Sequence, residues 1–222
     1  MFNVGFELEV VTEIEKSEMR SLLKNEFPSW HRDIKVVRDY TFAGWELVTK
    51  PYKYSEAQIK LEQLLKFIST HEELSTDKTT ALHINISHID NQKNKDLNID
   101  SIYHNLDIHK ILKKYGRVNN NYTRSPKKYM FYSYLDFNTL DEITSFLNNK
   151  DVQNAYMNKL RKKFEAELAE NRKNIPIAKK KSRGLTYFEF RMIGGVDYNK
   201  KLRSIKNDMA NMCASLATRI GV

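Results

Sequence analysis

The stretch Gly5-Phe6-Glu7-Leu8-Glu9-Val10 alternates apolar and acidic side chains. Successive side chains of a β-strand point to opposite faces of its sheet, so Glu7 and Glu9 share one face and the three hydrophobic residues share the other. The two carboxylates are then two residue rises apart, roughly 7 Å. The pattern predicts a strand with one face on a hydrophobic core and an acidic opposite face.

Three later stretches repeat this division into an apolar and a polar face: residues 44–48, 82–87 and 188–192. Their polar faces carry Glu46, His83, Asn85, Glu189 and Arg191. If all the strands share one sheet, four carboxylates and an imidazole meet on one wall, where they cannot all stay ionised without a counter-cation. The sequence therefore predicts a metal site with the ligands Glu7, Glu9, Glu46, His83 and Glu189.

Each part of this pattern also has a purely structural reading. An acidic outer face on an edge strand accounts for the first two glutamates, a lone strand histidine commonly serves a hydrogen bond, and a salt bridge accounts for the last acid and guanidinium. Two observations favour function. His83 shares its face with the polar Asn85, and Glu46 lies between Trp45 and Leu47, where a carboxylate is costly unless it is paired or metal-bound.

Helical periodicity fills much of the chain between these strands. Residues 55–72 carry leucines at helical spacing after Ser55 and Gln58, which together read as a capping box. Residues 202–220 carry the clearest apolar stripe and should pack under the sheet. Further helices are predicted at 100–115, where Gly116 is the stop, at a start marked by Thr139 and Glu142, and at 151–174.

The segment Lys179-Lys180-Lys181-Ser182-Arg183-Gly184 reads as a mobile basic loop before the last strand. Strands separated by helices, with polar residues confined to one sheet face, predict an α+β fold whose helices cover the other face. No repeat or linker divides the chain, so we expect one domain over residues 1–222.

Composition narrows the class of protein. An apolar share of 41% in 222 residues supports a real core, and Cys213 is the only cysteine, so an internal disulfide or a cysteine-rich zinc site is excluded. The first strand starts too early to follow a signal peptide, and no stretch has the length of a membrane span. We therefore expect a soluble, cytoplasmic protein that does not contact membranes.

The net charge and the absence of two phosphate-binding motifs limit the kinds of ligand to be expected. Lys and Arg outnumber Asp and Glu by 37 to 28, and the net charge of +9 favours anionic partners such as nucleotides, nucleic acids or acidic metabolites. The chain lacks the G-x-x-x-x-G-K-[ST] phosphate loop and the G-x-G-x-x-G turn. Any ATP must therefore be held through metal and basic side chains.

The four polar motifs also occur in a suggestive order. An E-x-E pair at Glu7 and Glu9 precedes Gly-x-Glu-Leu-Val-x-x-Pro at 44–51, then His-x-Asn-x-Ser at 83–87, then Glu-x-Arg at 189–191 before the final helix. This order resembles the amidoligases, carboxylate–amine ligases of the glutamine synthetase superfamily that also includes the gamma-glutamyl-cysteine ligases. The resemblance spans nearly the whole chain, although each motif is short.

The resemblance implies a curved, mostly antiparallel sheet of the glutamine synthetase type, whose concave polar face holds Mg²⁺ or Mn²⁺. ATP would phosphorylate a small-molecule or peptide carboxylate, and an amine would displace phosphate to form an amide. By the same resemblance, one ion would be bound by Glu7, His83 and Glu189 near the nucleotide phosphates. Glu9 and Glu46 would bind another near the substrate carboxylate.

Further roles are also implied only by the resemblance. Arg191 would stabilise the transferring phosphoryl group, and Asp39 would bind the incoming amine or a metal. Asn85 replaces the second histidine of the family's His-x-His and would hydrogen-bond in the site, while Lys50 departs from the small residue or proline expected before Pro51. The basic residues expected to contact the nucleotide are Arg124, Lys128 and Arg183.

Other functions remain open on the sequence. The basic stretches 113–128 and 159–183 suit a non-catalytic nucleic-acid-binding protein on the same scaffold. The clustered carboxylates, His and Arg also suit a two-metal phosphohydrolase or nuclease. The substrate could itself be a nucleotide or a peptide, with the basic loop as a lid over an anionic ligand.

Overall fold

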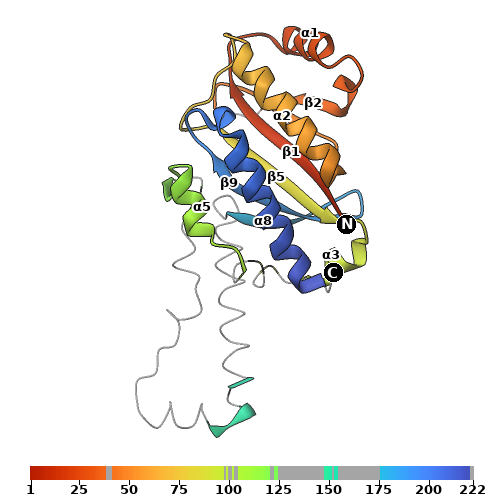
Figure 1. The fold of residues 1–222 in the computed structure, drawn as a ribbon, viewed down its shortest axis with the longest axis vertical. Coiled ribbons are helices and arrows are strands. Elements are labelled where there is room, and N and C mark those ends of the chain that lie inside the picture. The colour runs from red at the N-terminus through yellow and green to blue at the C-terminus, as the bar shows by residue number, and fades with distance from the viewer. Residues whose placement is uncertain are drawn as a thin grey trace.

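The computed structural model describes residues 1–38, 42–97, 99, 102, 105–120, 123–124, 148–151, 153–154 and 176–220. Its centre is a seven-stranded sheet in which neighbouring strands run antiparallel (Figure 1). The strand order is β2 (Ile34–Val37), β3 (Gly44–Thr49), β1 (Phe2–Val11), β5 (Ala81–His88), β9 (Leu185–Gly194) and β8 (Ile177–Ser182), with β4 (Tyr52–Lys53) paired to β1.

The four strands predicted from the polar motifs are β1, β3, β5 and β9, and they are direct neighbours in the sheet. The expectation that they share one sheet is confirmed. The α+β class and the antiparallel sheet are confirmed with it.

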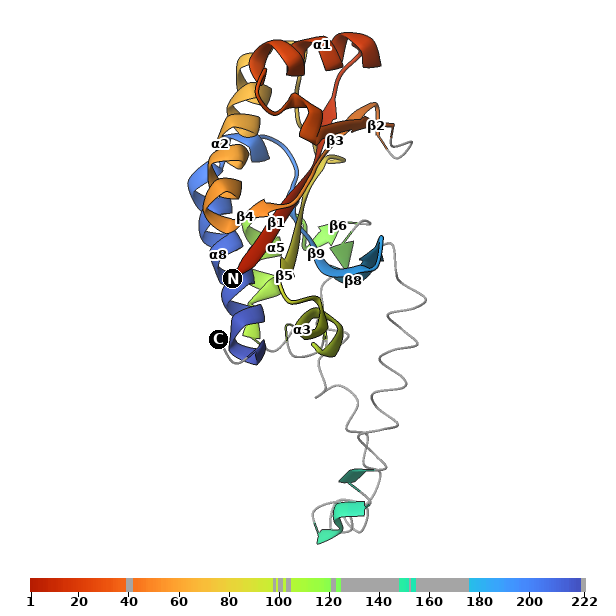
Figure 2. The ribbon, with the colours of Figure 1, turned by 90° about the vertical axis from the view of Figure 1, so that its right-hand side faces the viewer.

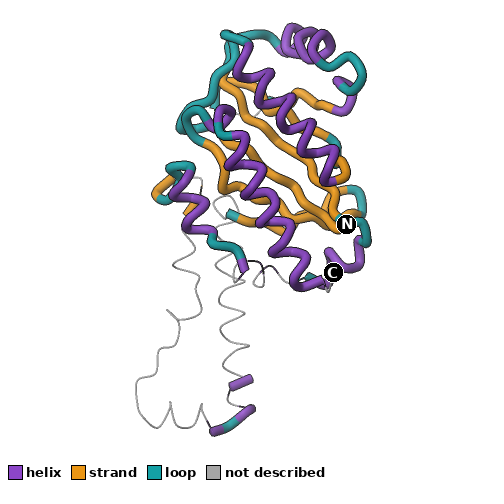
Figure 3. Tube along the Cα trace, viewed as in Figure 1, coloured by secondary structure: helices purple, strands orange, loops and turns teal. Residues whose placement is uncertain are grey.

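Two long helices, α2 (Tyr54–Thr70) and α8 (Leu202–Ile220), lie side by side across one face of the sheet (Figures 2 and 3). The apolar faces of the strands pack against them. On β1 the hydrophobic residues Phe6, Leu8 and Val10 are fully buried, as are Leu61 and Leu64 of α2. The predicted stripe of the last helix is also buried, at Ile205, Met209, Met212 and Leu216, and Cys213 is 8% exposed.

Shorter elements complete the described chain. They are α1 (Lys16–Glu26), α3 (Asn91–Asp96), α5 (Ile108–Lys114), the 3₁₀ turns η1 (His31–Asp33) and η4 (Tyr198–Lys200), and the ribbon of β6 (Asn119–Asn120) and β7 (Thr123–Arg124). The second half of the helix predicted at 100–115 is α5. Gly116 has φ +68°, which confirms it as the stop, because an L-residue rarely adopts that conformation.

The predicted capping box at the start of α2 is wrong. Helix α2 begins one residue earlier, at Tyr54, and its N-cap Lys53 makes no side-chain capping bond. The Gln58 amide donates instead to the Tyr54 hydroxyl (3.2 Å). The helices predicted from Thr139 and over most of 151–174 lie outside the described residues.

The predicted basic loop is also wrong, because residues 177–182 form edge strand β8. Ile177 and Ala178 are buried against the sheet, while the three lysines that follow made the segment read as polar and irregular. Only Arg183 and Gly184 turn the chain, with φ of 49° and 80°. Lysines on an edge strand discourage pairing with another chain.

Among the helices that the structure describes, none combines the length and apolarity needed to span a bilayer.

Candidate metal centre

Strand register brings the predicted ligands together on the sheet face opposite α2 and α8. Directly opposed residues of antiparallel strands share a face, and the register pairs Glu9 with Glu46, and Glu7 with His83. The next strand adds Glu189, which opposes Asn85. The convergence expected from alternation is therefore observed.

Glu7, His83 and Glu189 form one possible ligand group, with donor atoms all within 4.8 Å of one another. The His83 Nδ1 lies 3.2 Å from a Glu7 oxygen and 3.6 Å from a Glu189 oxygen. Two carboxylates and one imidazole on neighbouring strands make a largely buried group of three possible ligands.

Glu9, Glu46 and His83 form a second group of the same tightness. The opposite ring nitrogen, Nε2, faces Glu9 Oε1 at 3.9 Å. The other Glu9 oxygen, Oε2, accepts a 2.6 Å hydrogen bond from the backbone N–H of Ala81. Glu9 is only 5% exposed, so this bond fixes an otherwise costly buried carboxylate.

His83 belongs to both groups, which constrains how they can be filled. A neutral imidazole has one nitrogen with a free lone pair, while the other nitrogen carries a proton. Its ligation to a cation in one group therefore turns an N–H toward the other, where a carboxylate can accept it. Such a carboxylate partner is a common feature of metal-bound histidine.

Two cations already balance part of the negative charge. Glu189 is fully buried, and its carboxylate receives Lys180 Nζ at 2.7 Å and Arg191 Nη2 at 2.7 Å. With His83 neutral, the four carboxylates and two cations leave a local charge of −2. One divalent ion neutralises this charge, and a second calls for an anionic ligand such as a phosphate.

Glu7 is strongly held in its ionised form. Burial by itself would raise its pKa, but the hydrogen bond with His83, and the positive charge of that imidazole when it is protonated, act in the opposite direction. The Asn85 amide, which donates to Glu7 Oε1 (2.7 Å), and the charge of Lys180 add to this, and the pKa of Glu7 falls to about 2. Asn85 is thus placed in the cluster as a hydrogen-bond donor to a ligand.

A β-bulge lies beside the site. The register gives Leu82 opposite Ile193 and Ile84 opposite Phe190, so two residues of β9, Arg191 and Met192, oppose the single residue His83. Bulges re-aim side chains next to sites of this kind. Here the bulge keeps the apolar residues on both sides of it in the core while Arg191 turns to Glu189.

Two further residues of the site were missed by sequence reasoning. Lys180 was assigned to a loop, because the run of three lysines gives no alternation that would mark a strand. Tyr187 lies two residues before Glu189 on β9, and this spacing along a strand was the signal that could have found it. Tyr187 shares a sheet face with Glu189, and burial together with the charges of Glu7 and Glu189 raises its pKa.

The other predicted site residues lie elsewhere or outside the part of the chain that the structure describes. Arg183 sits in the turn after β8, four or more residues along the strand from Glu189, about 13 Å at 3.3 Å per residue. The side chain of Arg124 in β7 is not described, and Asp39 and Lys128 lie outside the described residues. Lys50 pairs with Asp33 at 2.8 Å.

The donor set fits a hard divalent cation. Carboxylate oxygens are the protein ligands that Mg²⁺ and Mn²⁺ prefer, and an imidazole is better tolerated by Mn²⁺ than by Mg²⁺. The absence of thiolate ligands from both groups argues against a structural zinc site.

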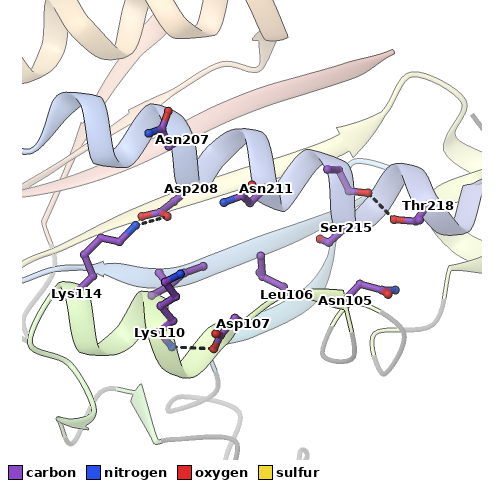
Figure 4. A pocket seen from close by; sticks show the side chains of 12 residues that line it. Asn105, Leu106, Asp107, Lys110, Lys114, Asn207, Asp208, Asn211, Ser215 and Thr218 are labelled. Atoms are coloured by element: carbon purple, nitrogen blue, oxygen red, sulfur yellow. Dashed lines mark hydrogen bonds and ion pairs between the residues drawn. The ribbon is translucent and has the colours of Figure 1, made fainter.

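A separate groove of about 590 Å³ lies on the helix face, between α5 and α8 (Figure 4). In this groove Lys114 Nζ lies 2.6 Å from Asp208 Oδ1, and the Asp107 carboxylate accepts a hydrogen bond from the backbone N–H of Lys110 (3.0 Å). The groove lies on the side of the sheet that α8 covers, opposite the metal cluster.

Comparison with protein families and with curated proteins finds no match to this chain. A function is therefore inferred from the residues and from their geometry.

Proposed function

We propose that this protein is an ATP- and Mg²⁺- or Mn²⁺-dependent ligase that joins a carboxylate to an amine through an acyl phosphate. The observation that carries the proposal is the cluster of Glu7, Glu9, Glu46, His83 and Glu189 on one sheet face, with Arg191 and Lys180 beside it. Further support is the order of the amidoligase-like motifs, which fall on four adjacent strands.

The proposed chemistry needs charge neutralisation more than covalent help. A carboxylate oxygen of the acid substrate attacks the terminal phosphorus of ATP, and ADP leaves. The amine then attacks the acyl carbon, phosphate leaves with the electrons of the C–O bond, and the amine loses a proton. Positioning and positive charge are what such phosphoryl transfers require.

Different residues of the chain would supply the metal ligands and the positive charge. Glu7, His83 and Glu189 would hold one divalent ion and Glu9 and Glu46 a second, and such ions supply neutralisation of phosphate charge. Arg191, which contacts Glu189, would stabilise the transferring phosphoryl group through the positive charge of its guanidinium. Lys180, with a 36% exposed side chain, adds a second positive charge from the edge strand. The amine-binding role of Asp39 follows from the resemblance.

The first test is ATP binding by calorimetry with and without Mg²⁺ or Mn²⁺, followed by ATP-dependent phosphate release in mixtures of acids and amines. Glu7→Gln and Glu189→Gln should each abolish the metal-dependent signal. Glu62→Gln, on the far side of the sheet in α2, is the matched control and should behave as wild type. Turnover that survives in the two cluster variants would end the proposal.

The same cluster suits a second candidate, a two-metal phosphohydrolase or nuclease, because paired ions also activate water for in-line displacement. This alternative predicts hydrolysis of ATP or of a phosphodiester that does not depend on an amine. The basic stretches that motivate nucleic-acid binding lie mainly outside the described residues, and that alternative predicts affinity falling steeply with salt.

A further inference from the structure

Arg117 is an arginine buried behind the metal cluster, with only 2% of its surface exposed. It follows α5 in a Schellman turn, in which the N–H of Gly116 donates to Lys113 O (3.2 Å) and that of Arg117 to Leu112 O (2.8 Å). This turn sends the Arg117 side chain into the protein. Burying a guanidinium costs free energy unless it is paired or hydrogen-bonded, so the contacts that Arg117 makes are informative.

The guanidinium contacts one particular peptide group. Arg117 Nη1 donates to the carbonyl oxygen of Thr80 at 3.0 Å, and the N–H of Gly195 donates to the same oxygen at 2.9 Å. The other end of that peptide is the N–H of Ala81, which donates to Glu9 Oε2 at 2.6 Å. One rigid peptide therefore links the arginine to a metal-ligand carboxylate.

The hydrogen bonds on the two sides of this peptide strengthen each other. A positive charge on the carbonyl side polarises the peptide and makes its N–H a better donor, and hydrogen bonds in series reinforce one another in a low-dielectric interior. Glu9 is held in this way at Oε2, which leaves Oε1 toward His83.

The backbone around the guanidinium is shaped to admit it. A Cβ at Gly194 would collide with Arg117 Nη1 and would lie 2.6 Å from Thr80 O. Any larger residue at 194 would therefore displace the arginine. The Tyr198 hydroxyl donates to the backbone oxygen of Glu9 (2.9 Å). Burial and the charge of Glu9 raise the pKa of Tyr198, and the charge of Arg117 acts against this rise.

We propose that Arg117 is a positioning residue for the metal centre: through the Thr80–Ala81 peptide it fixes the Glu9 carboxylate so that Oε1 is presented to the cation that Glu9 and Glu46 would hold. The inference rests on the metal site of the proposed function. It assigns Arg117 no contact with substrate.

The first measurement needs no metal. In the metal-free protein, Arg117→Gln should weaken the Ala81 N–H···Glu9 bond, so the Ala81 amide proton should move upfield and exchange faster in NMR spectra. Arg117→Lys keeps the charge but not the fork, and should give a smaller change in the same direction.

The second measurement is Mn²⁺ affinity by calorimetry. Loss of an outer partner of a ligand typically weakens metal binding by about tenfold or more, which is the change expected for Arg117→Gln. Asp107→Ala is the control, because it removes the cap of the same helix α5 without touching Thr80. It should leave both the Ala81 signal and Mn²⁺ affinity as in wild type.

The outcomes separate the hypotheses. A folded Arg117→Gln protein with an unchanged Ala81 amide would overturn the positioning role, as would an equal loss of Mn²⁺ affinity in Asp107→Ala. If Arg117→Gln does not fold, Arg117→Lys decides by the same two readouts. Absence of Mn²⁺ binding in wild type would refute the metal site of the proposed function, and the Ala81 shift would still test the hydrogen-bonded chain.

Discussion

Glu189 illustrates how the cluster keeps acidic groups inside the protein. Its side chain is fully buried, yet Lys180 and Arg191 both contact its carboxylate at 2.7 Å. A buried carboxylate without such partners would be destabilising by several kcal/mol, on the order of the penalty for an unpaired buried charge. The two cations therefore make the acidic face compatible with folding even before any metal binds.

Glu7 makes stability depend on pH in a defined window. Its pKa is lowered to about 2 in the folded protein, against an ordinary value of 4.5. The stabilisation from the ionised group is therefore fully present above pH 4.5 and is lost as pH falls toward 2, and it is on the order of 3 kcal/mol at most. In metal-free protein, Glu7→Gln should lack this dependence.

The measurement is urea unfolding of wild type and Glu7→Gln at pH 5 and at pH 3. The gap between their free energies of unfolding should narrow at the lower pH, and Glu13→Gln, an exposed glutamate outside the cluster, is the control. A gap that is constant or widens on acidification would contradict the assignment.

The β8–β9 hairpin is the element that carries Lys180 to the site. Its turn residues both have positive φ, as a type I′ turn requires, and Asn91 of α3 holds the turn by donating to Gly184 O (2.9 Å) and accepting from Thr186 N (2.8 Å). Positive φ is unfavourable for any residue with a Cβ, except that Asn tolerates it.

Substitutions at the two turn positions should therefore change the free energy of unfolding differently. Gly184→Ala should reduce the free energy of unfolding by about 1–2 kcal/mol and speed amide exchange along β8. Arg183→Asn creates the favoured Asn-Gly pair and should be neutral or stabilising by a few tenths of a kcal/mol, on the order of turn preferences. Urea unfolding and hydrogen exchange measure both, and equal destabilisation by the two changes would refute the turn assignment.

Arg183→Asn also tests a prediction made from the sequence. If Arg183 contacts nucleotide, the substitution should weaken ATP binding although the hairpin is intact. Unchanged affinity would remove Arg183 from the nucleotide site.

Local alternation made four of the strands predictable, because a pattern such as Phe6-Glu7-Leu8-Glu9 matches the two-residue period of a strand and not the 3.6-residue period of a helix. The convergence of the glutamates and His83 on one sheet face followed from it. Strand β8 was not predictable in the same way, since Lys179-Lys180-Lys181 carries no apolar alternation and its strand character comes from pairing with β9. That His83 belongs to both ligand groups could not be predicted either, because it depends on the register between strands that are far apart in sequence.

At the scale of the whole molecule, the two faces of the sheet differ in polarity. The helix face is apolar and closed by α2 and α8, whereas the opposite face gathers charge. A buried polar contact joins α8 to the end of α5: Asp208, 2% exposed, accepts from Lys114 Nζ (2.6 Å) and from the Tyr115 hydroxyl (2.8 Å).

Removing the two members of this pair should have unequal effects. Lys114→Met leaves Asp208 buried with a single neutral donor and should reduce the free energy of unfolding by about 2–3 kcal/mol, below the range for fully buried pairs because the Lys114 side chain is 35% exposed. Asp208→Asn should cost less, since Lys114 can turn to water and Asn can still accept from Tyr115.

Chemical denaturation of both single variants and of the double variant measures the coupling directly. The double variant should be more stable than Lys114→Met alone. Equal losses from the two single changes would show that Asp208 is not the constrained partner.

The bulge opposite His83 limits insertions and deletions in strand β9. Because Arg191 and Met192 together face one residue of β5, the strand on either side keeps its acid in the cluster and its aromatic and aliphatic residues in the core. Deletion of one residue here would straighten β9 and turn one half of it inside out, exposing Ile193 or burying Arg191 among hydrophobic side chains. The segment should therefore reject a one-codon insertion or deletion.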